Sequence, residues 1–226
     1  MIKVVIFDLD DTLISERKYI KSGYRAVAKA IKDMYNLEIG EDDIYSLLNT
    51  LFVENSKQVF DRALKSFGIC YSKEDILELV QVYRCHVPSI EYYDDVLDVI
   101  SKLKDRNIRL GIITDGYIET QQAKLKVLDA YNAFEKIIVT EELGRDYWKP
   151  HPKSFQMMKE YFNVEYEEML YVGDNPNKDF HIKKQLPIST ARIIREYGIY
   201  KDEPYKDNII SDYLIKNLNQ LLDIVK

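Results

Sequence analysis

Two aspartates, Asp8 and Asp10, stand directly after an apolar run near the start of the chain. The run, Lys3–Phe7, does not alternate between apolar and polar residues, which is typical of a parallel strand buried on both faces. In open α/β proteins, ligands bind where such strands end. Two carboxylates so close together are costly unless a cation or a phosphoryl group lies beside them. This pattern favours a metal site or phosphoryl transfer, although an ordinary polar loop remains open for this stretch alone.

Three later segments place polar side chains in comparable positions. Thr114 ends a second apolar run, and Asp174 and Asp179 follow a third. Lys149 stands just before a proline-marked helix start. These side chains therefore belong to the ends of predicted strands and to the loops beside them, as Asp8 does.

Taken together, the four segments resemble the haloacid dehalogenase-like (HAD) superfamily. Its motifs appear in order as Asp8-Leu9-Asp10-Asp11-Thr12, Thr114, Lys149, and Gly173-Asp174 with Asp179. One Asp-x-Asp-x-Thr is a moderate signal, but four motifs in order are a strong one. The resemblance covers the core portions of nearly the whole chain. One departure is the loop Arg145–Trp148, which is longer and more aromatic than the usual family version.

The remaining pattern predicts two parts. Alternating strands and helices favour a Rossmann-like parallel sheet with helices on both faces. Further strands are expected at 109–114, 136–140, 169–173 and 191–195, and helices at 93–104, 117–128, 152–162, 179–185 and 216–225. Residues 15–90 have helical spacing throughout, with one segment expected at 53–67, and 196–208 is expected to be a loop.

The distance between the first two motifs locates an insertion. Thr12 and Thr114 are separated by far more residues than one crossover helix requires. We therefore predict an α/β core, residues 1–14 and 91–226, and an inserted all-helical cap domain, residues 15–90. This organisation resembles the HAD subgroup whose cap closes over the site and selects the substrate.

The resemblance implies a role for both aspartates of the first motif. Asp8 would be the nucleophile, which attacks phosphorus and forms an aspartyl-phosphate. Asp10 would protonate the leaving oxygen and then deprotonate the attacking water. Because the dehalogenases of the superfamily typically lack this second aspartate, Asp10 favours phosphoryl transfer over carbon–halogen cleavage.

The resemblance also implies a phosphate-binding group. The Thr114 hydroxyl would bind a phosphoryl oxygen, and the amides of Asp115 and Gly116 would attract the anion at a helix start. Lys149 would neutralise charge on the nucleophile and the phosphoryl group. Arg17 lies close enough to the first motif to be a weaker candidate for substrate binding.

A divalent metal is the implied cofactor. Asp8 and Asp174 would bind it, with the main-chain carbonyl of Asp10 as a further ligand by resemblance. Asp179 is left with three alternatives: direct ligation, ligation through water, or orientation of Lys149; as an ordinary residue it could also be a helix cap. Hard oxygen ligands with room for water and phosphate suit Mg2+.

Composition excludes several other classes of protein. The net charge of −6 gives no basic footprint for nucleic acid, and no apolar run approaches the ~20 residues of a membrane span. No secretory signal is visible, and Cys70 and Cys85 have no metal spacing. We expect a cytoplasmic monomer or homodimer that binds a small phosphorylated metabolite.

The favoured function is a magnesium-dependent phosphatase that hydrolyses a small phosphate monoester of the sugar phosphate or nucleotide class. A phosphomutase on the same scaffold is the first alternative, because it uses the same aspartyl-phosphate. A non-catalytic HAD-like binding domain is the second, and the presence of all the catalytic residues argues against it.

Overall fold

The computed structural model describes residues 1–225 and divides into two compact units. Unit 1 consists of Met1–Arg17 and the chain from Ile90 onward, and unit 2 consists of Lys18–Ser89. These boundaries lie within three residues of the predicted ones. Arg17, which the prediction places in the cap, belongs to unit 1. Among residues 1–225, no helix combines the length and the apolar character needed to cross a membrane.

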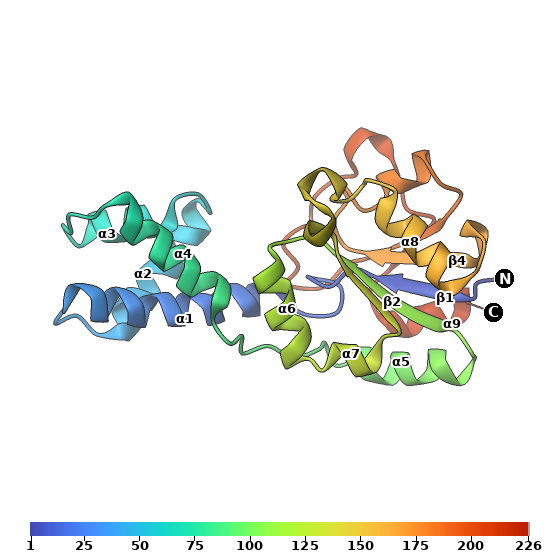
Figure 1. The fold of residues 1–226 in the computed structure, drawn as a ribbon, viewed down its shortest axis with the longest axis horizontal. Coiled ribbons are helices and arrows are strands. Elements are labelled where there is room, and N and C mark those ends of the chain that lie inside the picture. Colours follow the sequence, from blue (N-terminus) through green and yellow to red (C-terminus); the bar gives the residue numbers. More distant parts are fainter. Residues whose placement is uncertain (226) are drawn as a thin grey trace. The chain divides into compact units, whose positions relative to one another are not determined.

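Unit 1 is built on a parallel sheet, as predicted, and this sheet has six strands, one more than the sequence indicated. Its strands are β1 (Val4–Phe7), β2 (Arg109–Thr114), β3 (Lys136–Val139), β4 (Met169–Gly173), β5 (Ser189–Ile193) and β6 (Tyr213–Ile215). The strand order is β3-β2-β1-β4-β5-β6. β1 thus lies in the middle, paired in register with β2 on one side and with β4 on the other. This placement brings the ends of β1, β2 and β4 together at one edge (Figure 1).

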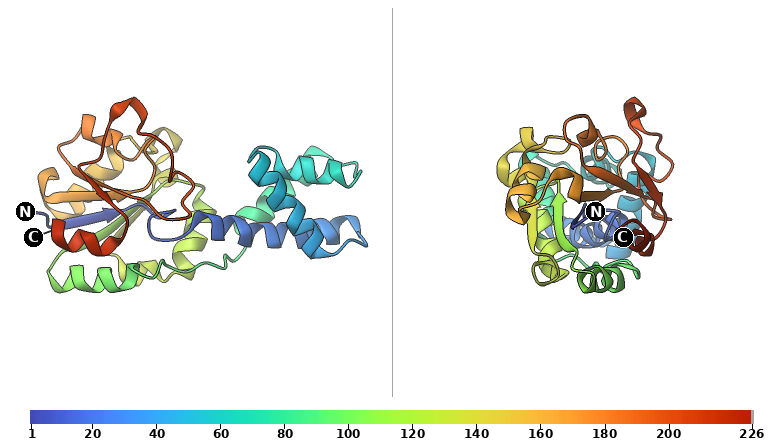
Figure 2. Two further views of the ribbon diagram at one scale, coloured as in Figure 1. Left: turned by 180° about the vertical axis from the view of Figure 1, so that it is seen from behind. Right: turned by 90° about the vertical axis from the view of Figure 1, so that its right-hand side faces the viewer.

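Helices cover both faces of this sheet because β1 is apolar on both faces. Val5 and Phe7 pack in the same core as α5 (Val96–Asp105) and α9 (Leu221–Ile224). Val4 and Ile6 pack in the core that includes α8 (Lys153–Phe162). The two further views show α9 beside α5 (Figure 2). All four strand residues are completely buried, and full burial of one such side chain contributes about 1.5–3 kcal/mol.

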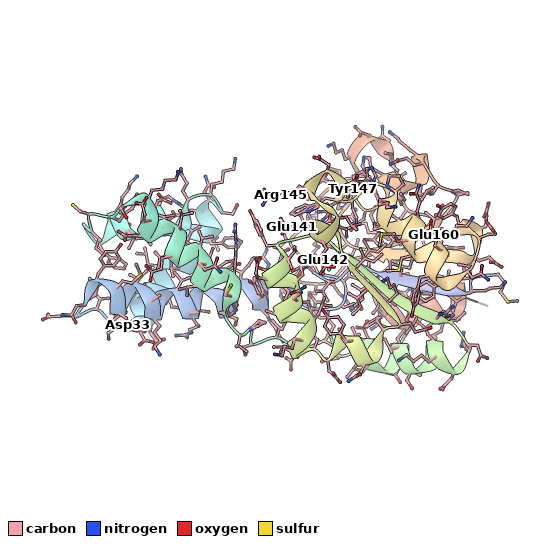
Figure 3. All side chains as sticks on the ribbon, in the orientation of Figure 1. Asp33, Glu141, Glu142, Arg145, Tyr147 and Glu160 are labelled. Atoms are coloured by element: carbon pink, nitrogen blue, oxygen red, sulfur yellow. The ribbon has the colours of Figure 1, made fainter. Side chains whose placement is uncertain are left out.

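The remaining helices of unit 1 are α6 (Ile118–Val127) and α7 (Ala130–Ala133). The segment between β3 and α8 forms two short 3-10 turns, Thr140–Leu143 and Arg145–Tyr147. Arg145 pairs there with Glu141 at 3.1 Å, and both residues are labelled in Figure 3. The longer loop noted in the sequence is therefore ordered by local contacts.

Unit 2 is helical, in agreement with the helical spacing of its sequence. It contains most of α1 (Glu16–Tyr35), followed by α2 (Glu41–Glu54), α3 (Val59–Ser66) and α4 (Lys73–Cys85). Ser72 and Asp75 form a reciprocal capping box at the start of α4. Tyr24, Phe60 and Tyr83 pack against one another at centroid distances of 5.8–6.1 Å.

Several predicted boundaries are wrong. The helical segment expected at 53–67 is interrupted, because the Asn55 side chain accepts a hydrogen bond from the Lys57 amide and Gln58 has a positive φ of 51°. The helix expected at 179–185 is a 3-10 turn, His181–Lys184. The helix expected from 216 begins at Leu218 and follows β6, an edge strand of three residues that was not predicted. So short a strand gives almost no periodic signal.

Candidate active site

The ends of the central strands supply the candidate catalytic side chains. Asp8 follows β1, Thr114 is the last residue of β2, and Asp174 follows β4. All three are buried. Gly173 precedes Asp174, and a Cβ atom there would lie 2.5 Å from the Asp179 carboxylate. Only glycine therefore lets Asp179 approach the end of β4 so closely.

Lys149 joins three of these groups in a buried network. Its Nζ lies 2.7 Å from Asp8 Oδ1, 3.1 Å from Asp179 Oδ1 and 2.8 Å from the Tyr171 hydroxyl. The Tyr171 hydroxyl donates to Asp179 Oδ1 at 3.2 Å, and the Asn175 amide donates to Asp179 Oδ2 at 2.9 Å. The Lys149 side chain is fully buried, so its charge acts on Asp8 without screening by bulk water.

Burial and like charges perturb the protonation of these carboxylates. Burial raises the pKa of Asp8 to about 6, although Lys149 acts in the opposite direction. Burial, with the nearby Asp179 and Asp8, raises the pKa of Asp174 well above its usual value. Burial acts to lower the pKa of Lys149, but Asp179 and Asp8 hold it well above its usual value. The lysine is therefore a permanent cation within an acidic cluster.

The acidic cluster has the donor chemistry of a divalent-cation site. One carboxylate oxygen from each of Asp8, Asp174 and Asp179 lies within 4.8 Å of the others. Hard oxygen donors of this kind suit Mg2+. Burial is the main cause of the raised pKa values of Asp8 and Asp174, and the neighbouring carboxylates add to it; a bound cation would favour the ionised form of both groups. Both Asp179 oxygens already accept hydrogen bonds, which favours a role for Asp179 in orienting Lys149 and the Asn175 amide.

The Asp10 carboxylate lies among different partners. Lys124 Nζ contacts both of its oxygens, at 2.7 and 2.8 Å, and Gln121 Nε2 donates to Oδ2 at 3.0 Å. The same Gln121 nitrogen donates to the Thr114 hydroxyl oxygen. The acid–base candidate and the phosphate-binding candidate are thus connected through α6.

The Asp115 side chain joins three segments of the site. Its Oδ1 accepts hydrogen bonds from the Thr140 hydroxyl at 2.7 Å and from the Lys149 amide at 3.1 Å. Its Oδ2 accepts from Lys178 Nζ at 2.7 Å. Burial acts to raise the pKa of Asp115, but Lys149 and Lys178 hold it below its usual value. The carboxylate therefore fixes the main chain at Lys149 as a constant negative charge.

Replacement of Asp115 by alanine is expected to lower both stability and turnover. It leaves the buried Lys149 amide without its acceptor and removes the partner of Lys178, a loss of about 1–3 kcal/mol. Urea denaturation with a turnover assay measures both effects. Asp202→Ala, at an exposed position, is the matched control. Equal stability of the two variants would contradict this role of Asp115.

A pocket of about 100 Å³ opens at this edge of unit 1. Its lining residues are Asp8, Asp10, Glu16, Asp115, Asp174, Asn175, Lys178 and Tyr200. Burial and the charge of Asp10 raise the pKa of Glu16 to about 8. Arg17 is exposed and does not line this pocket; its Nε donates to the Tyr197 carbonyl at 2.9 Å. Of the predicted site residues, Asp8, Asp10, Asp115 and Asp174 line this pocket. Lys149 and Asp179 join it through Asp8, Thr114 joins it through Gln121, and Arg17 lies apart.

Sequence reasoning missed several residues of the site. Asp11 is fully buried, and its carboxylate accepts from the Glu16 amide at 2.9 Å and from the Ile199 amide at 2.7 Å. Lys124, Gln121 and Lys178 were also missed. A lysine or glutamine on an amphipathic helix usually lies on the solvated face, so the sequence gives no signal for Lys124 or Gln121. The position of Lys178, beside Asp179, was the one available hint.

Comparison with known proteins finds a protein family whose model matches most of the chain. A model of haloacid dehalogenase-like hydrolases matches residues 5–193. A curated relative, the glyceraldehyde 3-phosphate phosphatase of Methanocaldococcus jannaschii, is 32% identical over 100% of this chain and 98% of its own length. The pyrophosphatase PpaX of Oceanobacillus iheyensis is 25% identical over 99% of this chain and 97% of its own length.

Solved structures agree on the fold. The structure of a predicted phosphoglycolate phosphatase from Haemophilus somnus 129PT superposes with a TM-score of 0.67 at 18% sequence identity. The match covers 100% of this chain and 98% of that one. At this identity the likeness concerns the fold alone, so the reaction has to be argued from the side chains.

Proposed function

Because the chain belongs to the haloacid dehalogenase-like hydrolase family, we propose that it is a magnesium-dependent phosphatase that hydrolyses a small phosphate monoester through an aspartyl-phosphate. The observation that carries the proposal is the buried Asp8 carboxylate, held at 2.7 Å by Lys149 where β1 ends. Two curated relatives over the full chain, which are named glyceraldehyde 3-phosphate phosphatases, agree with a phosphoric monoester hydrolase.

The proposed reaction proceeds in two steps. In the first, an Asp8 oxygen bonds to phosphorus while the bond from phosphorus to the leaving oxygen breaks, and Asp10 gives its proton to that oxygen. In the second, a water oxygen bonds to phosphorus while the Asp8–phosphorus bond breaks, and Asp10 takes a proton from the water. Thr114 and Lys149 stabilise charge on the phosphoryl oxygens in both steps.

Asp8 and Asp174 would hold Mg2+, with the Asp10 carbonyl as a further ligand. When bound, the ion would supply positive charge to the phosphoryl group. Asp179 would act mainly by orienting Lys149, which it contacts at 3.1 Å. We also propose that unit 2 is the cap domain that selects the substrate.

A screen of phosphate esters tests the proposal. Release of inorganic phosphate would be measured with Mg2+ for glyceraldehyde 3-phosphate, hexose phosphates, nucleotides and pyrophosphate. The named activities of the relatives justify the first and last compounds. Isomerised sugar phosphate without free phosphate, followed by 31P NMR, would favour the phosphomutase. An absence of turnover on every compound would favour the non-catalytic binding domain.

Replacement of Asp10 by alanine is expected to lower kcat/KM by ~10²–10⁴-fold, the usual range for a general acid–base group. The variant loses both the proton donor for the leaving oxygen and the base for water. Steady-state kinetics on the best ester measure the effect, with Asp105→Ala, an exposed position on α5, as the control. Unchanged turnover in Asp10→Ala would contradict the mechanism.

A further inference from the structure

Lys124 is a buried lysine that the proposed reaction does not use. It lies on α6, and its side chain is 4% exposed, while that of its partner Asp10 is 20% exposed. Its Nζ contacts both Asp10 oxygens, at 2.7 and 2.8 Å. A lysine loses its hydration on burial, so it is rarely found there without a charged partner. The two contacts fix the plane as well as the position of the carboxylate.

Gln121 lies one turn earlier on the same face of α6. It is 1% exposed, and its amide nitrogen contacts Asp10 Oδ2 and the Thr114 hydroxyl oxygen. An ionised carboxylate only accepts hydrogen bonds, so in this state of Asp10 the Gln121 amide presents its NH2 group to the carboxylate, and its second hydrogen meets Thr114. The Thr114 hydroxyl therefore accepts from Gln121 and keeps its own hydrogen to donate elsewhere.

We propose that Lys124 and Gln121 are positioning residues of the reaction, which hold the Asp10 carboxylate and the Thr114 hydroxyl in fixed orientations toward the leaving oxygen and the phosphoryl oxygens. This inference rests on the proposed function. Neither residue touches the reacting atoms; each acts through a group that does. A misplacement of about 1 Å costs roughly 10²-fold in rate, so the loss of Lys124 should be visible in turnover while the fold is kept.

The test uses two esters that differ in their need for a proton. The leaving group of glyceraldehyde 3-phosphate is an alkoxide, which requires a proton from Asp10. The leaving group of p-nitrophenyl phosphate is a stable phenolate, which requires little protonation. Lys124→Met is expected to lower kcat/KM by ~10²-fold for the first ester and by much less for the second. Lys124→Arg, which keeps the charge, should recover part of the loss. Lys126→Met, at an exposed position of α6, is the control.

A double variant separates positioning from a general structural role. If Lys124 acts through Asp10, then Lys124→Met should cause no further loss of kcat/KM in the Asp10→Ala background. If Lys124→Met does not fold, Gln121→Leu is measured instead, and its KM is expected to rise for both esters, also in the Asp10→Ala background, because Thr114 loses its orientation. A further loss when Lys124→Met is added to Asp10→Ala, equal losses on both esters in Lys124→Met, or an unchanged KM in Gln121→Leu would overturn the inference.

The outcome is distinguishable from failure of the proposed function. Wild-type protein that releases no phosphate from any compound of the screen, nor from p-nitrophenyl phosphate, would contradict the phosphatase itself and, with it, the role of Lys124. If the wild-type protein is active but the Lys124→Met and Lys126→Met variants have the same activity, the positioning role alone is contradicted.

Discussion

Replacement of Asp8 by asparagine is expected to abolish turnover and leave the fold intact. The change removes the attacking charge and one proposed metal ligand while it preserves the volume of the side chain. Lys149 keeps Asp179 and Tyr171 as partners, at 3.1 and 2.8 Å, so the buried cation is not left alone. Removal of the nucleophile should lower kcat by ~10⁴-fold or more.

Steady-state phosphate release measures this loss, and circular dichroism checks the fold. Intact-protein mass spectrometry during turnover adds a direct test, because a phosphorylated enzyme should appear in the wild type and not in Asp8→Asn. Asp33→Asn is the control, at the exposed position of α1 labelled in Figure 3. Near wild-type activity in Asp8→Asn would exclude Asp8 as the nucleophile.

Removal of divalent cations is expected to have an effect of similar size. Without a cation, the clustered carboxylates of Asp8, Asp174 and Asp179 repel the phosphoryl group. Activity should fall below detection in excess chelator and return with Mg2+. Ca2+ should restore it poorly, because Ca2+ prefers more ligands at longer distances.

Thermal unfolding gives a reading of cation binding that does not depend on turnover. A ligand that binds only the folded state adds about 2.7 kcal/mol at 100 times its Kd, so Mg2+ should raise Tm. The shift should be smaller in Asp174→Asn, which removes a proposed ligand. Full activity in excess chelator, together with a Tm that does not change when Mg2+ is added, would contradict the metal site.

The central features of unit 1 could be predicted because apolar runs that end in polar residues are a local signal. β1, β2 and β4 each end in a predicted site residue, and the parallel order places those ends together. The family prediction is confirmed by the match over residues 5–193. The α/β parallel fold is confirmed by the sheet itself.

The rest depended on contacts between residues far apart in the sequence. Lys124 reaches Asp10 across 114 positions, and Ile199 reaches Asp11 across 188. No periodicity in either segment signals such a contact, because a buried lysine on a helix has the same spacing as an exposed one. β6 was missed for a different reason: three residues are too few to show a pattern.

The position of β1 in the middle of the sheet has a consequence for synthesis of the protein. β1 is the first strand to be made, yet β2 follows it by about 100 residues and β4 by about 165. At 5–20 residues per second, its apolar residues remain without their second neighbour for on the order of ten seconds or more. The nascent chain is therefore expected to depend on chaperone protection of β1, and the position of Asp8 is expected to be fixed only after β4 has been translated.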